Sequence, residues 1–318
     1  MKILITGANG FLGSHIVEKS LAKGHETYAL IREGSDVSNL AHLNGFIEVS
    51  ADYSSVEAIL HTLNKLPKFD LVIHNAGLVK SYTFEGYKKV NIDLTQKITQ
   101  AVRQCDHFSD KLKFAYVSSL AAVGPVGNGG PASNYGRSKL MAEEIITSSG
   151  LNYLIFRPTG IYGSRDVQFV PLIKMVKMGI YPLMTSTNHK MTLINAQDVA
   201  ENIVNCSLKH SKQIVHLEDG HVYEHKDLKA ILEKTLSKKT FNLKASKRIV
   251  KFALFLSDLI DKNLGRTPKL SREHYSEISQ NWDYDFSEER KTIPLQINYP
   301  LEKGFEEAIE YYRANNLI

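Results

Sequence analysis

KILITGANGFLG, residues 2–13, is the stretch of sequence that decides the fold. Its opening, Lys2–Ile5, is an apolar run with β-branched side chains, which is typical of a strand buried in a parallel sheet. The segment from Phe11 to Lys23 then shows the amphipathic pattern of a helix. The stretch therefore predicts a strand, a tight turn and a helix, in that order.

Three glycines lie in and after the predicted turn, and each has a different task. Gly7 permits the turn, Gly10 lets the backbone approach a pyrophosphate, and Gly13 lets the helix pack closely on the strand. The N-terminus of the helix would face the phosphates. The spacing departs from GxGxxG by one residue, and a glycine-rich turn without a ligand is the alternative. Because a strand and a helix flank the turn, nucleotide binding is favoured, and its candidate residues are Gly7, Asn9, Gly10, Phe11, Leu12 and Gly13.

Tyr135 and Lys139 are four residues apart, within NYGRSK at residues 134–139. On a helix, residues at this spacing share one face, so the Lys139 ammonium can lower the phenol pKa of Tyr135 from about 10. A phenol with a lowered pKa can pass a proton to or from a substrate oxygen. Most Tyr and Lys pairs at this spacing are solvated helix faces. The glycine turn upstream makes hydride transfer on a bound nicotinamide the favoured interpretation.

Length and composition agree with a globular, ligand-binding protein. The chain has 318 residues, 43% hydrophobic and 23% charged, which is enough for one large core and a smaller lobe. No apolar run reaches the length of a membrane span, and the first strand follows Met1 directly. We therefore expect no integral membrane segment, no signal peptide and a cytoplasmic protein. The net charge of +5 is compatible with an anionic small-molecule ligand, and no motif supports nucleic-acid binding.

Cysteine and histidine usage gives no sign of a metal site. Cys105 and Cys206 both fall in apolar helical patterns, so buried thiols are expected in preference to a disulfide. The 12 histidines are scattered without the spacing of metal ligands. We predict no structural metal.

Strands alternate with helical or turn segments along the first half of the chain. This alternation predicts an α/β fold with a Rossmann-like, doubly wound parallel sheet. A long amphipathic helix is expected over Phe84–His107 and another over Tyr135–Ser148. The expected strands are Lys2–Thr6, Glu26–Ile31, Phe46–Val49, Asp70–His74, Lys113–Val117 and Tyr153–Phe156.

Several ordered motifs resemble the extended short-chain dehydrogenase/reductase family, which includes nucleotide-sugar epimerases, hydroxysteroid dehydrogenases and dihydroflavonol reductases. The resemblance covers nearly the whole chain. It implies an NAD(P)-binding Rossmann domain over residues 1–163 and a smaller C-terminal substrate lobe over most of 164–318, with some segments returning to the sheet. The matching motifs are TGANGFLG at 6–13, HNAG at 74–77, VSS at 117–119, Tyr135 with Lys139, RPTGIYG at 157–163 and NAQDVA at 195–200.

The resemblance also implies a catalytic site. Ser119, in preference to Ser118, matches the residue that hydrogen-bonds the substrate oxygen. Tyr135 is then the general acid or base, and Lys139 lowers its pKa and binds the nicotinamide ribose. Hydride would move between nicotinamide C4 and a carbinol carbon. Asn91 resembles an asparagine that supports the proton path, with a buried structural asparagine as the alternative.

Cofactor choice should be visible at the end of the second strand, where Arg32 matches a position that NADP-preferring relatives often fill with arginine. NADP is favoured over NAD, although Glu33 follows directly and could oppose a phosphate. Alternatively, Arg32 stacks on the adenine of either cofactor. Asp52 matches an aspartate near the adenine amine, with helix capping as its alternative. The other residues expected to contact the cofactor are Tyr53, Asn75, Ala76, Gly77, Pro158 and Thr159.

The resemblance leaves the substrate open between two classes. The segment after the sixth strand looks more like that of hydroxysteroid dehydrogenases, since epimerases commonly have Asn where Pro158 or Thr159 stands. Epimerases also tend to clamp the diphosphate with an arginine, where this chain offers His189 and Lys190. An NAD(P)-dependent oxidoreductase acting on a secondary alcohol and a ketone is favoured. The alternatives are a nucleotide-sugar epimerase or dehydratase and a non-catalytic NAD(P)-binding sensor.

Two further expectations concern partners. Basic residues between Lys234 and Lys251 precede the apolar stretch 249–256, a pairing that suits a membrane surface or lipid. An amphipathic helix of the substrate lobe is the favoured explanation for this segment, residues 234–260. Many members of the family dimerise through two long helices, so the resemblance implies a possible homodimer.

Overall fold

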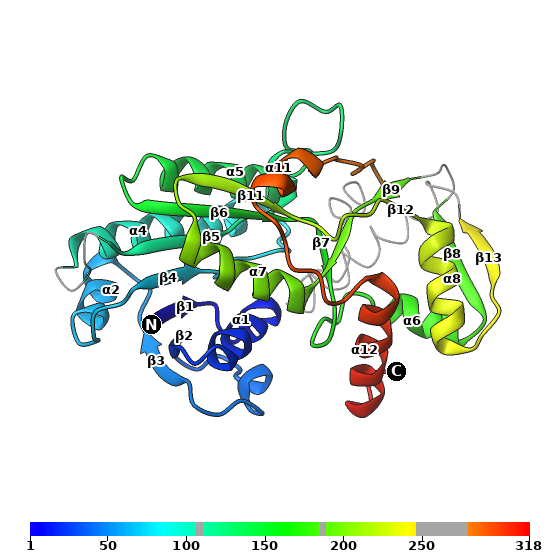
Figure 1. The fold of residues 1–318 in the computed structure, drawn as a ribbon, viewed down its shortest axis with the longest axis horizontal. Helices are drawn as coiled ribbons and strands as arrows, with labels where there is room; N and C mark the ends of the chain where they lie inside the picture. The colour runs from blue at the N-terminus through cyan, green and yellow to red at the C-terminus, as the bar shows by residue number, and fades with distance from the viewer. Residues whose placement is uncertain (106–107, 109–110, 185–188, 246–278) are drawn as a thin grey trace.

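Seven parallel strands form the central sheet of the computed structural model, which describes residues 1–105, 108, 111–184, 189–245 and 279–318 (Figure 1). Their order across the sheet is β3-β2-β1-β4-β5-β6-β11. The sheet confirms the predicted doubly wound α/β fold, because the chain starts at β1 and winds outward in both directions. The strands are β1 (Lys2–Thr6), β2 (Glu26–Arg32), β3 (Ile47–Ala51), β4 (Leu71–His74), β5 (Lys113–Val117), β6 (Asn152–Pro158) and β11 (Gln213–Leu217).

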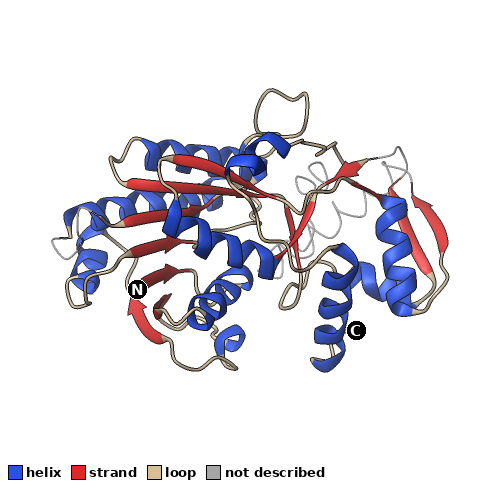
Figure 2. Cartoon of the chain, viewed as in Figure 1, coloured by secondary structure: helices blue, strands red, loops and turns tan. Residues whose placement is uncertain are grey.

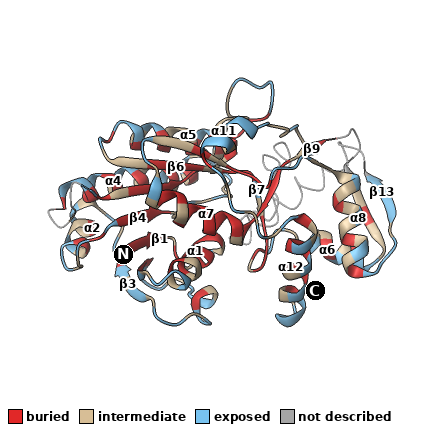
Figure 3. Cartoon of the chain, in the orientation of Figure 1, coloured by how far each residue is buried: buried red, intermediate tan, exposed pale blue. Residues whose placement is uncertain are grey.

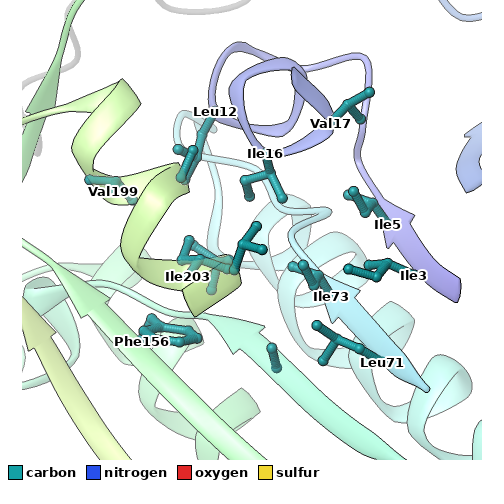
Figure 4. Packing of buried hydrophobic residues seen from close by; sticks show 14 of the residues in the cluster. Ile3, Ile5, Leu12, Ile16, Val17, Leu71, Ile73, Phe156, Val199 and Ile203 are labelled. Atoms are coloured by element: carbon teal, nitrogen blue, oxygen red, sulfur yellow. The ribbon is translucent and has the colours of Figure 1, made fainter. Parts of the chain in front are cut away.

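Helices cover both faces of this sheet (Figure 2). On one face, α1 (Phe11–Ala22) packs beside α7 (Ala196–Lys209). Figure 4 shows Leu12 of α1 and Ile203 of α7 with the sheet residue Ile73 in one apolar core. The other face is covered by α2 (Val56–Leu63), α4 (Leu94–Gln104) and α5 (Asn134–Thr147).

The long helix predicted over Phe84–His107 is wrong as a single α-helix. The chain forms α3 (Phe84–Tyr87), then a π-helical segment over Lys88–Asp93, and then α4. Cys105 already has an extended backbone, so the helix ends at Gln104. A π-helical turn holds an extra residue and often marks a functional site.

The C-terminal half builds a second core beside the sheet. Tyr162 stacks on Phe305 with their ring centroids 4.6 Å apart. Figure 3 shows the buried sides of α8 and α12 in this region. The contributing elements are β7 (Gly160–Tyr162), α6 (Val170–Lys177), β8 (Ile180–Met184), β10 (Leu193–Asn195), α8 (His225–Leu236) and α12 (Leu301–Ala314). The remaining elements are β9 (Lys190–Met191), β12 (Tyr223–Glu224), β13 (Phe241–Ala245), α11 (Ser287–Thr292) and the 3-10 turns Ser38–Leu40 and Leu120–Ala122.

The chain passes between these two parts more than once. Although both follow residue 163, α7 packs on the sheet and β11 is one of its strands. Later, Ile293 packs into the core of the sheet before the chain reaches α12. Asp198 of α7 fixes the segment that leads from Ile293 to α12. Its carboxylate accepts hydrogen bonds from the backbone N–H groups of Asn298 and Tyr299, both 2.9 Å long.

The structure describes only residues 234–245 of the predicted basic and apolar segment 234–260. Lys234 lies on α8 and pairs with Glu302 at the surface, and burial is confined to the opposite side of α8. Lys247, Arg248, Lys251 and the apolar stretch 249–256 lie outside the described residues. Of the helices in the described ranges, none combines the length and apolarity that crossing a membrane requires.

Candidate active site

The turn after β1 has the close backbone contacts that its glycines predict. Gly7 has φ +64°, and Gly10 donates its N–H to the Gly7 carbonyl at 3.2 Å. A Cβ on Gly13 would lie 2.0 Å from the Gly7 oxygen, so α1 sits directly against the turn. Gly10 is the N-cap of α1 and provides no side-chain cap, which leaves the first N–H groups of the helix for another acceptor.

The other side chains of this turn are partly engaged within the protein. Asn9 donates from Nδ2 to the Asp36 carbonyl at 2.7 Å. Phe11 is half-buried against the His15 ring, with the centroids 5.8 Å apart, and Leu12 packs into the core. Leu12 can therefore reach a cofactor mainly through its backbone.

The HNAG motif forms the loop beside this turn. Asn75 donates from Nδ2 to the Gly7 carbonyl at 3.2 Å. A Cβ on Gly7 would lie 2.7 Å from Cα of Ala76, so only a glycine fits between the two loops. The carboxyl ends of β1 and β4 therefore hold Gly7, Asn75 and Ala76 together.

Lys139 is buried at the centre of the candidate site and only 4% exposed. Its Nζ donates to the Val117 carbonyl at 2.6 Å and lies 4.5 Å from the centroid of the Tyr116 ring. A Cβ on Gly77 would lie 3.6 Å from the same Nζ. Burial lowers the pKa of Lys139 to about 7, and the nearby Glu143 carboxylate opposes that shift.

Tyr135 lies one helical turn before Lys139, in the first turn of α5. Its half-buried ring lies 6.1 Å from the ring of Tyr87, measured between centroids. Burial raises the pKa of Tyr116 well above its usual value, and the electrostatic effect of the nearby Tyr135 adds to that shift. Tyr135, Lys139 and Tyr116 thus form one neighbourhood.

The two serines after β5 have different surroundings. Ser118 is buried and its hydroxyl hydrogen-bonds the Glu143 carboxylate. Ser119 is half-buried, and its oxygen accepts the Ala121 N–H at 3.1 Å. Because accepting that bond leaves the hydroxyl hydrogen of Ser119 available, Ser119 suits a substrate oxygen better than Ser118 does.

Asn91 lies in the π-helical segment and is fully engaged. Its Oδ1 accepts the Leu78 N–H at 2.7 Å, and its Nδ2 donates to the Leu78 carbonyl at 3.0 Å. Nδ2 also donates to the Ser138 hydroxyl at 2.8 Å. These contacts favour the structural alternative, in which Asn91 holds the loop after β4 against α5.

The residues expected to contact the adenosine half lie apart from this cluster, beside β2 and β3. Arg32 is exposed at the end of β2. The helix-capping alternative for Asp52 is wrong, since Ser55 is the N-cap of α2. Asp52 instead accepts the Ser54 N–H at 2.8 Å, a bond that lowers the pKa of its exposed carboxyl. Tyr53 donates to the Leu30 carbonyl at 3.1 Å.

Pro158 and Thr159 lie at the end of β6, where Thr159 donates its N–H to the Leu217 carbonyl at 3.0 Å. The hydroxyl of Thr159 is buried and has no hydrogen-bond partner among the described residues. A dinucleotide would fit this edge of the sheet, because the glycine turn and the uncapped α1 N-terminus offer donors and the Thr159 hydroxyl lacks a partner. Across the described ranges, no group of three or more His, Cys, Asp or Glu side chains could hold a metal ion.

Sequence reasoning missed Glu143 and Arg157, which together lie beneath this site. Arg157 donates to Glu143 from Nε at 3.0 Å and from Nη2 at 2.6 Å. Glu143 follows Lys139 by four residues, the same spacing that singled out Tyr135. That repeat on one helix face could have revealed it.

The sheet order and the glycine turn define an α/β protein of the dinucleotide-binding class. More closely, the chain belongs to the NAD dependent epimerase/dehydratase family, whose family model matches residues 3–223. This membership confirms the resemblance and makes the protein an enzyme of the extended short-chain dehydrogenase/reductase type. The family is described as NAD dependent.

Individual relatives carry different activities. The chain is 31% identical to ceramide reductase of Caulobacter vibrioides (strain NA1000 / CB15N), over 64% of this chain and only 59% of that protein. It is 23% identical to UDP-glucose 4-epimerase of Vibrio cholerae, over 99% of this chain and 96% of that one. The structure of UDP-glucose 4-epimerase from Thermotoga maritima with UDP-glucose superposes with a TM-score of 0.77 at 18% identity, covering 99% of this chain and 100% of the other. At that identity the structural match supports the fold alone.

Proposed function

We propose that the protein interconverts a secondary alcohol and a ketone with a nicotinamide cofactor, using Ser119, Tyr135 and Lys139. The observation that carries the proposal is the burial of the Lys139 ammonium one helical turn after Tyr135, between Gly77 and the Val117 carbonyl. In this role the bound nicotinamide supplies or accepts the hydride. The protein contributes orientation and proton transfer.

Each of the three side chains has a separate task in this proposal. Ser119 orients the reacting oxygen with its hydroxyl hydrogen. Tyr135 gives a proton to that oxygen or takes one from it. Lys139 favours the ionised phenol electrostatically and donates to the ribose. The turn around Gly10 and the loop at Asn75–Gly77 would hold the rest of the cofactor.

Lipid-like alcohols and ketones are the favoured substrates. Ceramide reductase, by its name, belongs to this class. A nucleotide-sugar epimerase needs a clamp for the diphosphate, yet Lys190 already pairs with Asp283 at 3.2 Å. His189, beside it, is buried. The match to UDP-glucose 4-epimerase over almost the full length keeps epimerisation as the second candidate.

A substrate panel separates these functions. We expect ceramide-like and sterol-like alcohols or ketones to change the absorbance of the nicotinamide as they turn over. An epimerase would instead convert one UDP-sugar isomer into another, visible by NMR without net cofactor reduction. Tight cofactor binding with no turnover on any member of the panel would contradict both enzyme proposals and favour the sensor.

We also propose that the enzyme prefers NADP, because Arg32 is exposed at the end of β2, where a 2′-phosphate would lie. Arg32→Ala is expected to raise the Kd for NADP about tenfold, since hydrogen bonds to charged groups are worth about 1.5–3 kcal/mol. The Kd for NAD should change little, and calorimetry measures both. Glu33→Ala is the matched control, and it should tighten NADP binding slightly. A wild-type protein that binds NAD more tightly than NADP would refute the preference.

A further inference from the structure

Beneath the candidate site, polar residues lie side by side at or next to the carboxyl ends of three neighbouring strands. Thr6 of β1 is opposite His74 of β4, which in turn is opposite Tyr116 of β5. His74 is completely buried, and its ring stacks on Tyr116 with the centroids 5.6 Å apart. A fully buried imidazole requires a partner for each nitrogen.

The hydrogen bonds around His74 fix which nitrogen carries the proton. Thr95 donates its hydroxyl hydrogen to the Asn91 carbonyl at 2.7 Å, so its oxygen can only accept from Nε2 of His74, 3.0 Å away. On the other side, Nδ1 lies 2.7 Å from the Thr6 hydroxyl. The Thr6 oxygen accepts the Ala76 N–H at 3.1 Å, and Nδ1 can accept the Thr6 hydrogen only if Nδ1 itself carries no hydrogen. Only the neutral imidazole with hydrogen on Nε2 satisfies every bond.

The electrostatic surroundings favour the same neutral form. Burial lowers the pKa of His74 to about 3, and the Lys139 ammonium lowers it further. A charged imidazole would also have two donors and no acceptor for the Thr6 hydrogen. His74 is thus unsuited to carry a proton. It is suited to keep a constant pair of hydrogen bonds, one to Thr6 and one to Thr95.

These hydrogen bonds connect the cofactor side of the site to helix α5. At one end the Ala76 N–H, beside Gly7, bonds to Thr6, and at the other end Thr95 bonds to Asn91. Asn91 then donates to Ser138, whose hydroxyl donates to the Tyr135 carbonyl at 2.7 Å. These bonds therefore fix the position of the loop after β4 relative to the first turn of α5.

We infer that His74 is a positioning residue of the proposed active site: as an Nε2-protonated neutral imidazole, it ties the cofactor-facing loop after β4 to Asn91 and so to the turn that carries Tyr135. This inference rests on the proposed function for its effect on rate. The tautomer itself follows from the hydrogen bonds alone. Nothing in this role requires His74 to touch the substrate or the cofactor.

The first test is a histidine side-chain ¹⁵N NMR experiment on the wild-type protein, with the His74 signal identified by its loss in His74→Gln. We expect the Nε2-protonated neutral form throughout the range between about pH 5 and 8, without titration. An Nδ1-protonated ring or a cation in that range would overturn the inference. This readout does not depend on finding a substrate, so it is informative even if the proposed reaction is wrong.

The second test compares three single variants, and the double variant His74→Asn/Thr95→Val, by steady-state kinetics. His74→Asn can keep an acceptor near Nδ1 but loses the donor to Thr95, and is expected to lower kcat about tenfold to a hundredfold, the cost of slight misplacement. His74→Gln can keep a donor near Nε2 and should retain kcat within about threefold, with KM unchanged. Thr95→Val should reproduce the loss of His74→Asn, and the double variant should lose little more, because both break one link.

The matched control is Thr99→Val. Thr99 is buried on the same helix and donates to the Thr95 carbonyl at 2.7 Å, but it lies one turn farther from Asn91. The kcat of the Thr99→Val enzyme should stay at the wild-type value. If His74→Asn and His74→Gln lose kcat equally, and only in proportion to their loss of thermal stability, His74 is a packing residue and the inference fails.

Discussion

Tyr135→Phe is expected to lower kcat by about 10²- to 10⁴-fold, the usual contribution of a positioned acid or base. The substitution removes only the hydroxyl, while the ring keeps its place beside Tyr87. Lys139 and the glycine turn are unchanged, so the Kd for the cofactor should stay within a factor of about three. Stopped-flow or steady-state turnover of the best substrate, together with calorimetry, measures both quantities.

Tyr311→Phe provides the control for this loss. Tyr311 is half-buried on α12, against Tyr312 and outside the candidate site, and its replacement should leave kcat unchanged. A Tyr135→Phe enzyme with a kcat close to wild type would show that another group transfers the proton.

Gly13→Ala is expected to destabilise the protein by about 3 kcal/mol or more and to weaken cofactor binding about a hundredfold. The new Cβ would lie 2.0 Å from the Gly7 oxygen and 2.9 Å from Cα of Ala8. Both are backbone atoms, so no side chain can rotate away to make room. Instead α1 must move from β1, and this motion displaces the N-terminal N–H groups that face the phosphates. Chemical denaturation and calorimetry give the two values.

Gly130→Ala is the matched glycine substitution. A Cβ at Gly130 would meet no atom within 4 Å, so the free energy of unfolding should change by no more than about 0.5 kcal/mol. Equal effects of the two substitutions would mean that the close contact of α1 with the turn does not limit stability or binding.

The sequence allowed the central sheet to be predicted because its signals are local. β1 and β5 have the predicted bounds, and β2 extends one residue beyond its predicted end. Each of these strands is a short apolar run that ends at a turn residue. The run and the turn residue lie within a few positions of each other in the sequence. The glycine turn was predictable for the same reason.

Features that depend on distant partners were not predictable in this way. The π-helical segment adds one residue to a helix whose apolar pattern looks continuous, and Asn91 bonds to Ser138 only when α5 packs beside it. His74 is 68 residues from Thr6, and no local pattern indicates that their side chains meet.

The repeated passage of the chain between the sheet and the second core limits how the protein can be re-engineered. After β10 the chain returns to the sheet for α7 and β11, leaves again for α8, and comes back at Ile293 before it ends in α12. A chimera that takes its substrate-recognition half from a relative therefore has several splice points to match, one of them at the Asp198 contact with Asn298 and Tyr299. Grafting a single loop onto the intact scaffold, such as residues 124–131 between Ser119 and Tyr135 of the candidate site, is the more practical route to altered selectivity.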